Sequence, residues 1–291
     1  MPLERWSPTP RQGISAQRVK LSGCVPDDGV AYLAAAAGDS PFAPGEPLEP
    51  GTPLGHPIPA WFHPTTGDEP PHLLNSDVPI VGETPDVLVV DEPHGLPSTP
   101  NGCLMRATAQ TLLRIRREEP DLVAAHRLDR LTGGLLLFSR RQPTRGFLQT
   151  QFQRHEVSKC YRARTEVDVD TVLGTRTDVG AVVASGKRTR VTLPMRKDKG
   201  NPHVSVHPNG KMTETWVTRV GDREFALEPR TGHTHQLRVL MNHLGMPIAG
   251  DDTYPHVRDA DLWDADAKKL QLRAVRLELK LPDGQLGSWE I

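Results

Sequence analysis

Residues 126–134, with the sequence HRLDRLTGG, hold the arrangement best suited to chemistry. One carboxylate, Asp129, stands between Arg127 and Arg130. The two guanidinium groups favour its ionised form, because opposite charge nearby stabilises a charged group. An ionised carboxylate that is held in place can act as a nucleophile. The residues alone leave a second interpretation open, in which Asp129 is a capping residue with an ordinary salt bridge.

A second polar segment covers residues 230–238, with the sequence RTGHTHQLR. His235 and Arg238 are three residues apart and share a face if this segment is helical. With His233 and His243 the segment also invites a metal site. The spacing of these histidines is not that of a zinc site, however, and no acidic residue lies among them. We therefore expect no metal here, and a solvated polar helix face is the simple alternative.

Tyr161 is the third candidate, because the chain has only 3 tyrosines. It lies at the start of a predicted strand, between Lys159 and Arg162. The commoner situation for a single tyrosine is a half-buried ring with a solvated hydroxyl, and the residues leave both interpretations open.

Short apolar runs and periodic segments predict the elements that must position these residues. Strands are expected at residues 86–91, 134–139, 161–167, 213–220, 224–228 and 272–279. Helices are expected at residues 102–118, 144–154 and 234–244. Because strands dominate and do not alternate strictly with helices, we predict an α+β fold with a mixed, mostly antiparallel central sheet flanked by helices.

The first hundred residues differ in composition from the rest and contain 19 of the 28 prolines. Proline removes backbone donors and excludes long helices. We predict that residues 1–80 form an irregular, acidic, Pro-rich extension packed on or beside the core. Within it, residues 28–37 could form a short helix and residues 53–63 could hold edge strands. Residues 81–291 are then the main domain.

The net charge of −1 hides a strong asymmetry. Residues 1–100 carry a net −9, whereas residues 101–291 carry a net +8. Residues 106–164 alone hold 13 basic and 5 acidic residues. This predicts a polyanion site on the core, with a solvated surface as the alternative. The candidate phosphate contacts are Arg116, Arg117, Arg140 and Arg141.

Cysteine usage and hydropathy indicate the compartment. Cys24, Cys103 and Cys160 are scattered, so we expect neither disulfides nor a cysteine zinc site, and a cytoplasmic location. The longest apolar run, residues 30–37, is far short of the ~20 residues that span a bilayer. The N-terminus has no signal-peptide pattern, and we expect no association with a membrane.

Taken together, these segments resemble the RluA-type pseudouridine synthases, which isomerise uridine to pseudouridine in ribosomal and transfer RNA. The family pattern HRLDxxTSGLLL matches residues 126–137, with Gly133 in place of serine. Residues 159–161 match its K-x-Y segment, residues 230–238 its RTGRTHQLR segment and residues 243–254 its HLGxPIxGDxxY segment. The resemblance covers about residues 85–282.

The chain departs from the family pattern at three further positions. Glu92 stands where lysine is usual, His233 where arginine is usual and Arg273 where histidine is usual. These departures bear on substrate choice more than on activity. Residues 1–80 do not resemble the S4 RNA-binding domain of many members, and the Pro-rich leader is similar to those of actinobacterial members.

The resemblance implies a role for each matched residue. Asp129 would be the catalytic nucleophile, Arg238 its ion-pair partner, and Tyr161 the ring that stacks on the flipped base and serves the C5 proton step. Leu272 would line the pocket opposite Tyr161. The residues expected to bind RNA are Arg127, Arg130, Thr132, Lys159, His235 and Leu272. The resemblance implies an isomerase that needs no cofactor and no metal and acts on RNA as a monomer.

Two other functions remain open at this stage. A non-catalytic RNA-binding relative would share the fold, although such a protein has no need for Asp129. A glycosidase would use Asp129 as a nucleophile, but most glycosidases need two carboxylates ~5–10 Å apart. Asp129 is the only acid within its own matched segment, residues 126–137.

Overall fold

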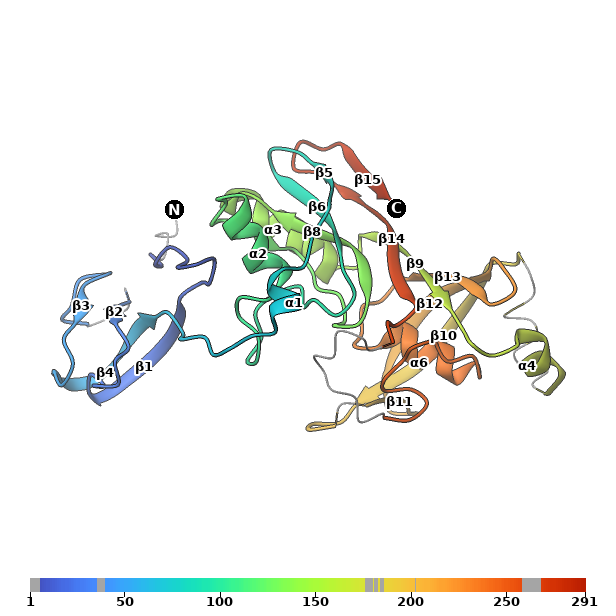
Figure 1. The fold of residues 1–291 in the computed structure, drawn as a ribbon, viewed down its shortest axis with the longest axis horizontal. Helices are drawn as coiled ribbons and strands as arrows, with labels where there is room; N and C mark the ends of the chain where they lie inside the picture. Colours follow the sequence, from blue (N-terminus) through green and yellow to red (C-terminus); the bar gives the residue numbers. More distant parts are fainter. Residues whose placement is uncertain are drawn as a thin grey trace. The chain divides into compact units, whose positions relative to one another are not determined.

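The computed structural model describes residues 6–35, 40–175, 180, 183, 186–201, 203–257 and 268–291. The chain divides into two compact units, which are described separately (Figure 1). The N-terminal unit comprises Met1–Glu69 and Thr99–Pro120, and the core unit comprises Pro70–Ser98 and Asp121–Ile291. The domain boundary expected at residue 80 stays a prediction.

The N-terminal unit contains a four-stranded antiparallel sheet, so the expectation of an irregular extension is wrong. Its strands are β1 (Gln17–Cys24), β4 (Pro53–Phe62), β2 (Tyr32–Ala34) and β3 (Pro47–Leu48), in that order across the sheet. Pro57 of β4 lies where the β1–β4 register shifts between Leu21 and Gly23, whereas Pro53 and Pro59 pair in register with Cys24 and Lys20. The helix expected at residues 28–37 is also wrong, since β2 occupies this segment; residues 36–39 lie outside the described residues.

The helix expected at residues 102–118 is shorter in the structure, where α2 spans Ala109–Arg116. The backbone N–H groups of residues 105–107 donate to the buried Glu69 carboxylate at 2.6–3.1 Å. This contact holds the preceding residues in turns. Thr108 then caps α2, because its hydroxyl accepts from the Thr111 N–H at 3.2 Å.

The core unit is built on one mixed sheet, which confirms the predicted α+β fold (Figure 1). Its main path runs β11 (Val204–Val206), β10 (Thr189–Lys197), β12 (Lys211–Arg219), β13 (Glu224–Pro229), β9 (Ser158–Arg164), β14 (Leu272–Lys280), β8 (Gly133–Ser139), β6 (Val87–Glu92) and β5 (Ile80–Glu83). Two further strands join it: β15 (Leu286–Glu290) pairs with β14, and β7 (Val123–Ala124) pairs with β8. Only the β14–β8 pairing is parallel among the described strands.

The described helices of the core unit are α1 (Pro71–Leu74), α3 (Gln142–Gln153), α4 (Val169–Thr175) and α6 (Gln236–His243). Leu240 and Met241 of α6 lie in one buried cluster with Phe225 and Leu227 of β13. Leu148 of α3 lies in a second buried cluster with apolar side chains of β6 and β8. No helix in the described part of the chain is both long and apolar enough to cross a membrane.

Gly134 explains how β8 and β14 approach each other so closely. Its φ is +111°, and a Cβ at this position would lie 2.2 Å from the Ala274 carbonyl oxygen. Only glycine fits such a contact without strain. Gly134 therefore lets the backbone of β14 lie against β8, directly after the loop that carries Asp129.

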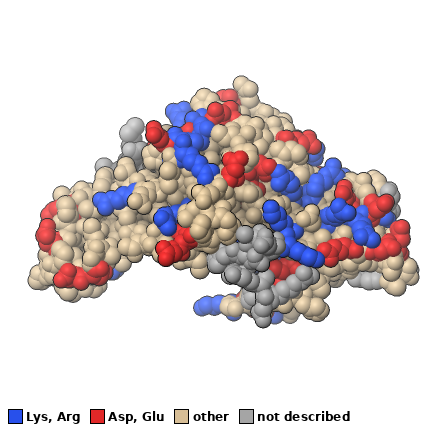
Figure 2. All heavy atoms as spheres, in the orientation of Figure 1, with Lys and Arg blue, Asp and Glu red and all other residues tan. Residues whose placement is uncertain are grey.

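Charge is distributed differently over the two units (Figure 2). In the visible face, acidic side chains gather over one end of the four-stranded sheet of the N-terminal unit. Over the core unit, basic and acidic side chains alternate in this view, so no single wide basic face is seen.

Candidate active site

The loop that carries Asp129, residues 126–132, is fixed by the segment that follows β6. The Leu128 N–H donates to the Ser98 hydroxyl at 3.0 Å, and the Gly95 N–H donates to the Arg130 carbonyl at 3.1 Å. The His94 ring, through Nδ1, bonds the Leu131 carbonyl at 2.8 Å. Three successive contacts thus hold the backbone on both sides of Asp129.

Glu92 supports this arrangement from inside the sheet. It is fully buried, and its Oε1 accepts a hydrogen bond from the Ser98 hydroxyl at 3.0 Å. Its other oxygen is buried without a hydrogen-bond partner among the described residues. Burial raises the pKa of Glu92 well above its usual range, and the Ser98 bond only partly lowers it. The side chain is therefore a neutral acid that anchors Ser98.

This burial predicts that Glu92→Gln stabilises the protein as pH rises. The raised pKa means that the folded state holds a proton which the unfolded state releases above about pH 4.5. Stability contributed by this group is therefore lost with increasing pH, and the neutral glutamine removes the loss. Thermal unfolding measured from pH 5 to 9 should show a growing advantage for the variant. The exposed Glu156→Gln is the control; equal pH dependence for wild type and Glu92→Gln would contradict the assignment.

His126 braces the other end of the loop. Its ring stacks on Phe152 with centroids 4.3 Å apart, and its Nε2 accepts the Leu137 N–H at 3.2 Å. Burial lowers the pKa of His126 to about 3, and the charge of Lys159 acts in the same direction. The ring is therefore neutral near pH 7, as the bond from Leu137 requires.

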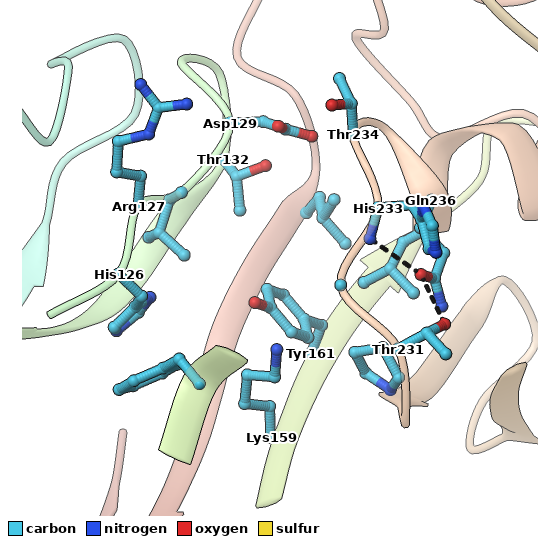
Figure 3. A pocket seen from close by; sticks show the side chains of 16 residues that line it. His126, Arg127, Asp129, Thr132, Lys159, Tyr161, Thr231, His233, Thr234 and Gln236 are labelled. Atoms are coloured by element: carbon cyan, nitrogen blue, oxygen red, sulfur yellow. Dashed lines mark hydrogen bonds between the residues drawn. The ribbon is translucent and has the colours of Figure 1, made fainter. Parts of the chain in front are cut away.

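A cavity of about 320 Å³ opens beside this loop (Figure 3). Asp129 and Thr132 lie at one end, and Lys159 and Tyr161 extend into it from β9. The other lining residues are His126, Arg127, Leu128, Phe152, Pro229, Thr231, Gly232, His233, Thr234, Gln236, Leu237 and Leu272. Six of the predicted site residues therefore meet here, namely Asp129, Tyr161, Arg127, Thr132, Lys159 and Leu272.

Asp129 is open to a ligand. Among the described residues its carboxylate has no hydrogen-bond partner, while its backbone carbonyl accepts the Thr132 N–H at 2.7 Å and closes the turn. Burial raises the pKa of Tyr161, and the Asp129 charge raises it further, so the phenol is protonated near neutral pH. Burial also lowers the pKa of Lys159.

The expected direct pairing of Arg238 with Asp129 is wrong for this structure. The Arg238 guanidinium donates to both oxygens of Asp251, from Nε at 2.8 Å and from an Nη at 2.5 Å. It also donates to Asp252 at 2.8 Å. Burial lowers the pKa of Arg238, but Asp251, Asp252 and Asp129 together raise it, so the guanidinium stays charged. Asp129 therefore acts on Arg238 through space.

Asp252 connects Arg238 to the loop that carries Asp129. Its two oxygens accept from Arg238 at 2.8 Å and from Arg130 at 3.0 Å. Burial tends to raise the pKa of Asp252, but the Thr253 hydroxyl and the two guanidinium groups lower it overall. Arg130 and Arg238 thus lie behind the cavity and do not line it.

The histidines of the second polar segment have separate surroundings. His235 adopts the left-handed conformation, with φ 54°, just before α6, and its Nδ1 lies 3.1 Å from the Tyr254 hydroxyl. His233 lines the cavity instead. Among the described residues, no three His, Cys, Asp or Glu side chains gather as a metal site requires.

Arg273, which stands where the family pattern has histidine, pairs through its guanidinium with Asp91 of β6.

Three of the four arginines proposed for phosphate contacts form ion pairs with acidic side chains. Arg117 pairs with Glu119, Arg140 with Glu83 and Arg141 with Asp86. Arg116 and Arg117 also belong to the N-terminal unit, whereas Arg140 and Arg141 belong to the core unit. The arginine patch that the sequence suggested therefore stays a prediction.

Sequence reasoning gave no role to Asp251, Asp252, Ser98 or Gln236. The side chain of Gln236 accepts from the Thr231 hydroxyl at 2.9 Å and from the His233 N–H at 3.2 Å, and so shapes the cavity wall. Asp251 and Asp252 lie in the matched GDxxY segment, so a signal was present for them. Ser98 belongs to none of the matched motifs and carries no signal of its own.

Comparison with known proteins places this site in a family. The sequence pattern of the RNA pseudouridylate synthase family matches residues 86–243. The chain is 31% identical over 208 residues to ribosomal large subunit pseudouridine synthase C of Vibrio parahaemolyticus, covering 70% of this chain and 61% of that protein. It is 32% identical over 215 residues to dual-specificity RNA pseudouridine synthase RluA of Vibrio vulnificus, covering 70% and 78%.

The solved structures give the same fold. Human RNA pseudouridylate synthase domain containing 1 aligns with a TM-score of 0.56 at 21% identity, over 77% of this chain and 86% of that chain. The match over residues 86–243 includes the loop of Asp129, strand β9 with Tyr161, and helix α6 with Arg238. The chain therefore belongs to the RNA pseudouridylate synthase family.

Proposed function

We propose that this chain is an isomerase that converts specific uridines of ribosomal or transfer RNA to pseudouridine. The observation that carries the proposal is the Asp129 carboxylate, which faces a cavity of about 320 Å³ and has no hydrogen-bond partner among the described residues. An aromatic ring, Tyr161, and two cations, Arg127 and Lys159, line the same cavity. A flipped nucleotide needs a stacking surface, a cationic edge and a positioned nucleophile, and these residues provide all three.

In the proposed reaction the target nucleotide leaves its stack, and Asp129 attacks C1′ as the bond from N1 to C1′ breaks. The uracil turns, and C5 then displaces the Asp129 carboxylate from C1′, so that a bond from C5 to C1′ forms and the carboxylate is released. The C5 proton leaves and N1 takes up a proton, so the product is an isomer of the substrate. Oxidation state does not change, and the residues themselves supply the nucleophile and the proton transfers, without a cofactor.

Each proposed role fits the position of its residue. Tyr161 stacks on the flipped base, Leu272 lines the cavity beside it, and Arg127 contacts the nucleotide. Thr132 and Lys159 line the cavity and remain proposed RNA contacts. Arg130 and His235 bond Asp252 and Tyr254 instead, so we assign them to positioning the site.

Tyr161→Phe should separate stacking from proton transfer. The ring and its stacking surface remain, whereas the hydroxyl that serves the C5 proton step is lost. We expect RNA affinity near that of the wild type and slow release of tritium from [5-³H]uridine RNA. Tritium release and filter binding measure the two quantities on the same preparation. Loss of affinity in proportion to loss of rate would contradict the assigned role.

The function itself is tested by a carbodiimide stop assay on RNA from a strain lacking the gene and from its parent. One or a few pseudouridine stops should disappear in the strain and return when purified protein is added. Release of free uracil with an abasic site would indicate a glycosidase. RNA binding without conversion would indicate a non-catalytic relative.

We also propose that the protein works as a monomer in the cytoplasm. The thiols of Cys24 and Cys103 are exposed and free, which suits a reducing compartment. Sedimentation of the purified protein checks the monomer.

A further inference from the structure

A second cavity, of about 350 Å³, adjoins the candidate active site in the core unit. His233 and Thr234 line both cavities and form the wall between them. The other lining residues of the second cavity are Met195, Arg196, Lys197, Val204, Asn209, Gly210 and Lys211. A strand with one nucleotide in the first cavity would meet this second cavity immediately beyond the shared wall.

The sheet register places two lysines on the side of this second cavity. Lys211 lies directly opposite Met195 in the β10–β12 pairing, and Lys197 is two residues beyond Met195 on β10. Residues at these positions share one face of a sheet. The turn that leads into Lys211 is tight, because a Cβ on Gly210 would lie 2.6 Å from the Met195 backbone. The close approach of Gly210 to β10 therefore fixes the start of β12 beside this cavity.

The two lysines are exposed and are not used by the fold. Neither Lys197 nor Lys211 has an ion pair among the described residues, whereas Arg196 pairs with Asp198 at 2.9 Å. The charge of Lys211 reaches the shared wall, because burial lowers the pKa of His233 and Lys211 lowers it next. Among the described residues no acidic side chain lines the second cavity, although Asp198 bonds the lining residue Arg196. A phosphate there would meet two lysines that have no ion pair among the described residues.

We propose that the second cavity binds the RNA backbone flanking the target uridine, with Lys197 and Lys211 as the phosphate contacts. This inference rests on the proposed function. Asn209 and Thr234 add neutral hydrogen-bonding groups, as phosphate and sugar contacts commonly use. Such contacts carry little sequence information but hold the strand while one nucleotide is turned out of its stack.

The test is the double variant Lys197→Gln, Lys211→Gln, compared with Lys187→Gln, Lys280→Gln. The control removes the same charge from lysines that line neither cavity. We expect KM for RNA to rise roughly ten-fold at low salt, as two exposed charge contacts are lost, with the effect on KM and not on kcat. The slope of log affinity against log salt should fall by roughly 1.4, about 0.7 for each contact to a single strand.

The outcomes separate this inference from the proposed function. An unchanged KM and salt slope, or the same change in the control, overturns the second cavity as an RNA site while leaving the activity in place. If wild-type protein makes no pseudouridine, the proposed function fails, and filter binding still decides the role of the two lysines. Circular dichroism melts confirm that both double variants fold.

Discussion

Asp129→Asn should abolish pseudouridine formation while leaving the fold intact. The asparagine is nearly isosteric, and the loop is held by bonds from the Leu128 N–H and to the Arg130 and Leu131 carbonyls, which do not involve the Asp129 side chain. The amide cannot serve as the nucleophile that the reaction requires. We expect no activity above background in the tritium-release assay and a melting temperature near that of the wild type.

The control for this prediction is Asp283→Asn, an exposed acid in the turn before β15, which should keep full activity. The RNA affinity of Asp129→Asn should stay close to that of the wild type, because the Asp129 carboxylate does not attract RNA phosphates. Full conversion of uridine by purified Asp129→Asn would falsify the proposed mechanism, whatever the fold.

The catalytic part of the chain was largely predictable from local patterns. Strand β8 is a continuous apolar run, and every residue of it is buried in the structure. The apolar stripe of α6 is equally plain, although the left-handed His235 delays its start by two residues. These elements follow from burial and periodicity, which a single sequence contains.

The N-terminal sheet was not predictable in the same way. Proline normally argues against a central strand, yet β4 pairs with both β1 and β2. Pro53 and Pro59 pair in register with β1, and Pro57 lies at a register shift, so the place of this strand depends on its partner strands. Turns at residues 105–107 likewise depend on Glu69, which is distant in sequence. The local sequence of a segment does not reveal these contacts, because they involve residues that are distant in the sequence.

The partner of Arg238 was missed for a similar reason. Sequence resemblance pointed from Arg238 to Asp129, but the turn after α6 brings Asp251 and Asp252 against the guanidinium. Asp251 is itself fixed, since its Oδ1 accepts the N–H groups of Thr253 at 2.8 Å and Tyr254 at 2.9 Å. Arg238 therefore joins this turn to α6 through its ion pairs, and it acts on Asp129 only through its charge.

This arrangement predicts that Arg238→Met destabilises the protein strongly in addition to removing activity. Asp251 is 1% exposed, so the variant leaves a buried carboxylate without its cation. Breaking a buried ion pair from one side typically costs about 3–5 kcal/mol. Chemical unfolding should show a decrease of this size in the free energy of unfolding. The variant also lacks the positive charge of Arg238 that interacts with Asp129.

The double variant Arg238→Met, Asp251→Asn distinguishes this ion pair from a simple packing loss. The neutral asparagine still accepts the N–H groups of Thr253 and Tyr254, while the uncompensated charge disappears. We expect the double variant to be more stable than Arg238→Met alone, which is a favourable coupling between neighbouring sites. Activity should not return, because Arg238 is still missing beside Asp129. The alternative result is a loss of unfolding free energy in the double variant equal to the sum of the losses in the two single variants. The stability of this turn would then come from packing around the Arg238 side chain and not from its pairing with Asp251.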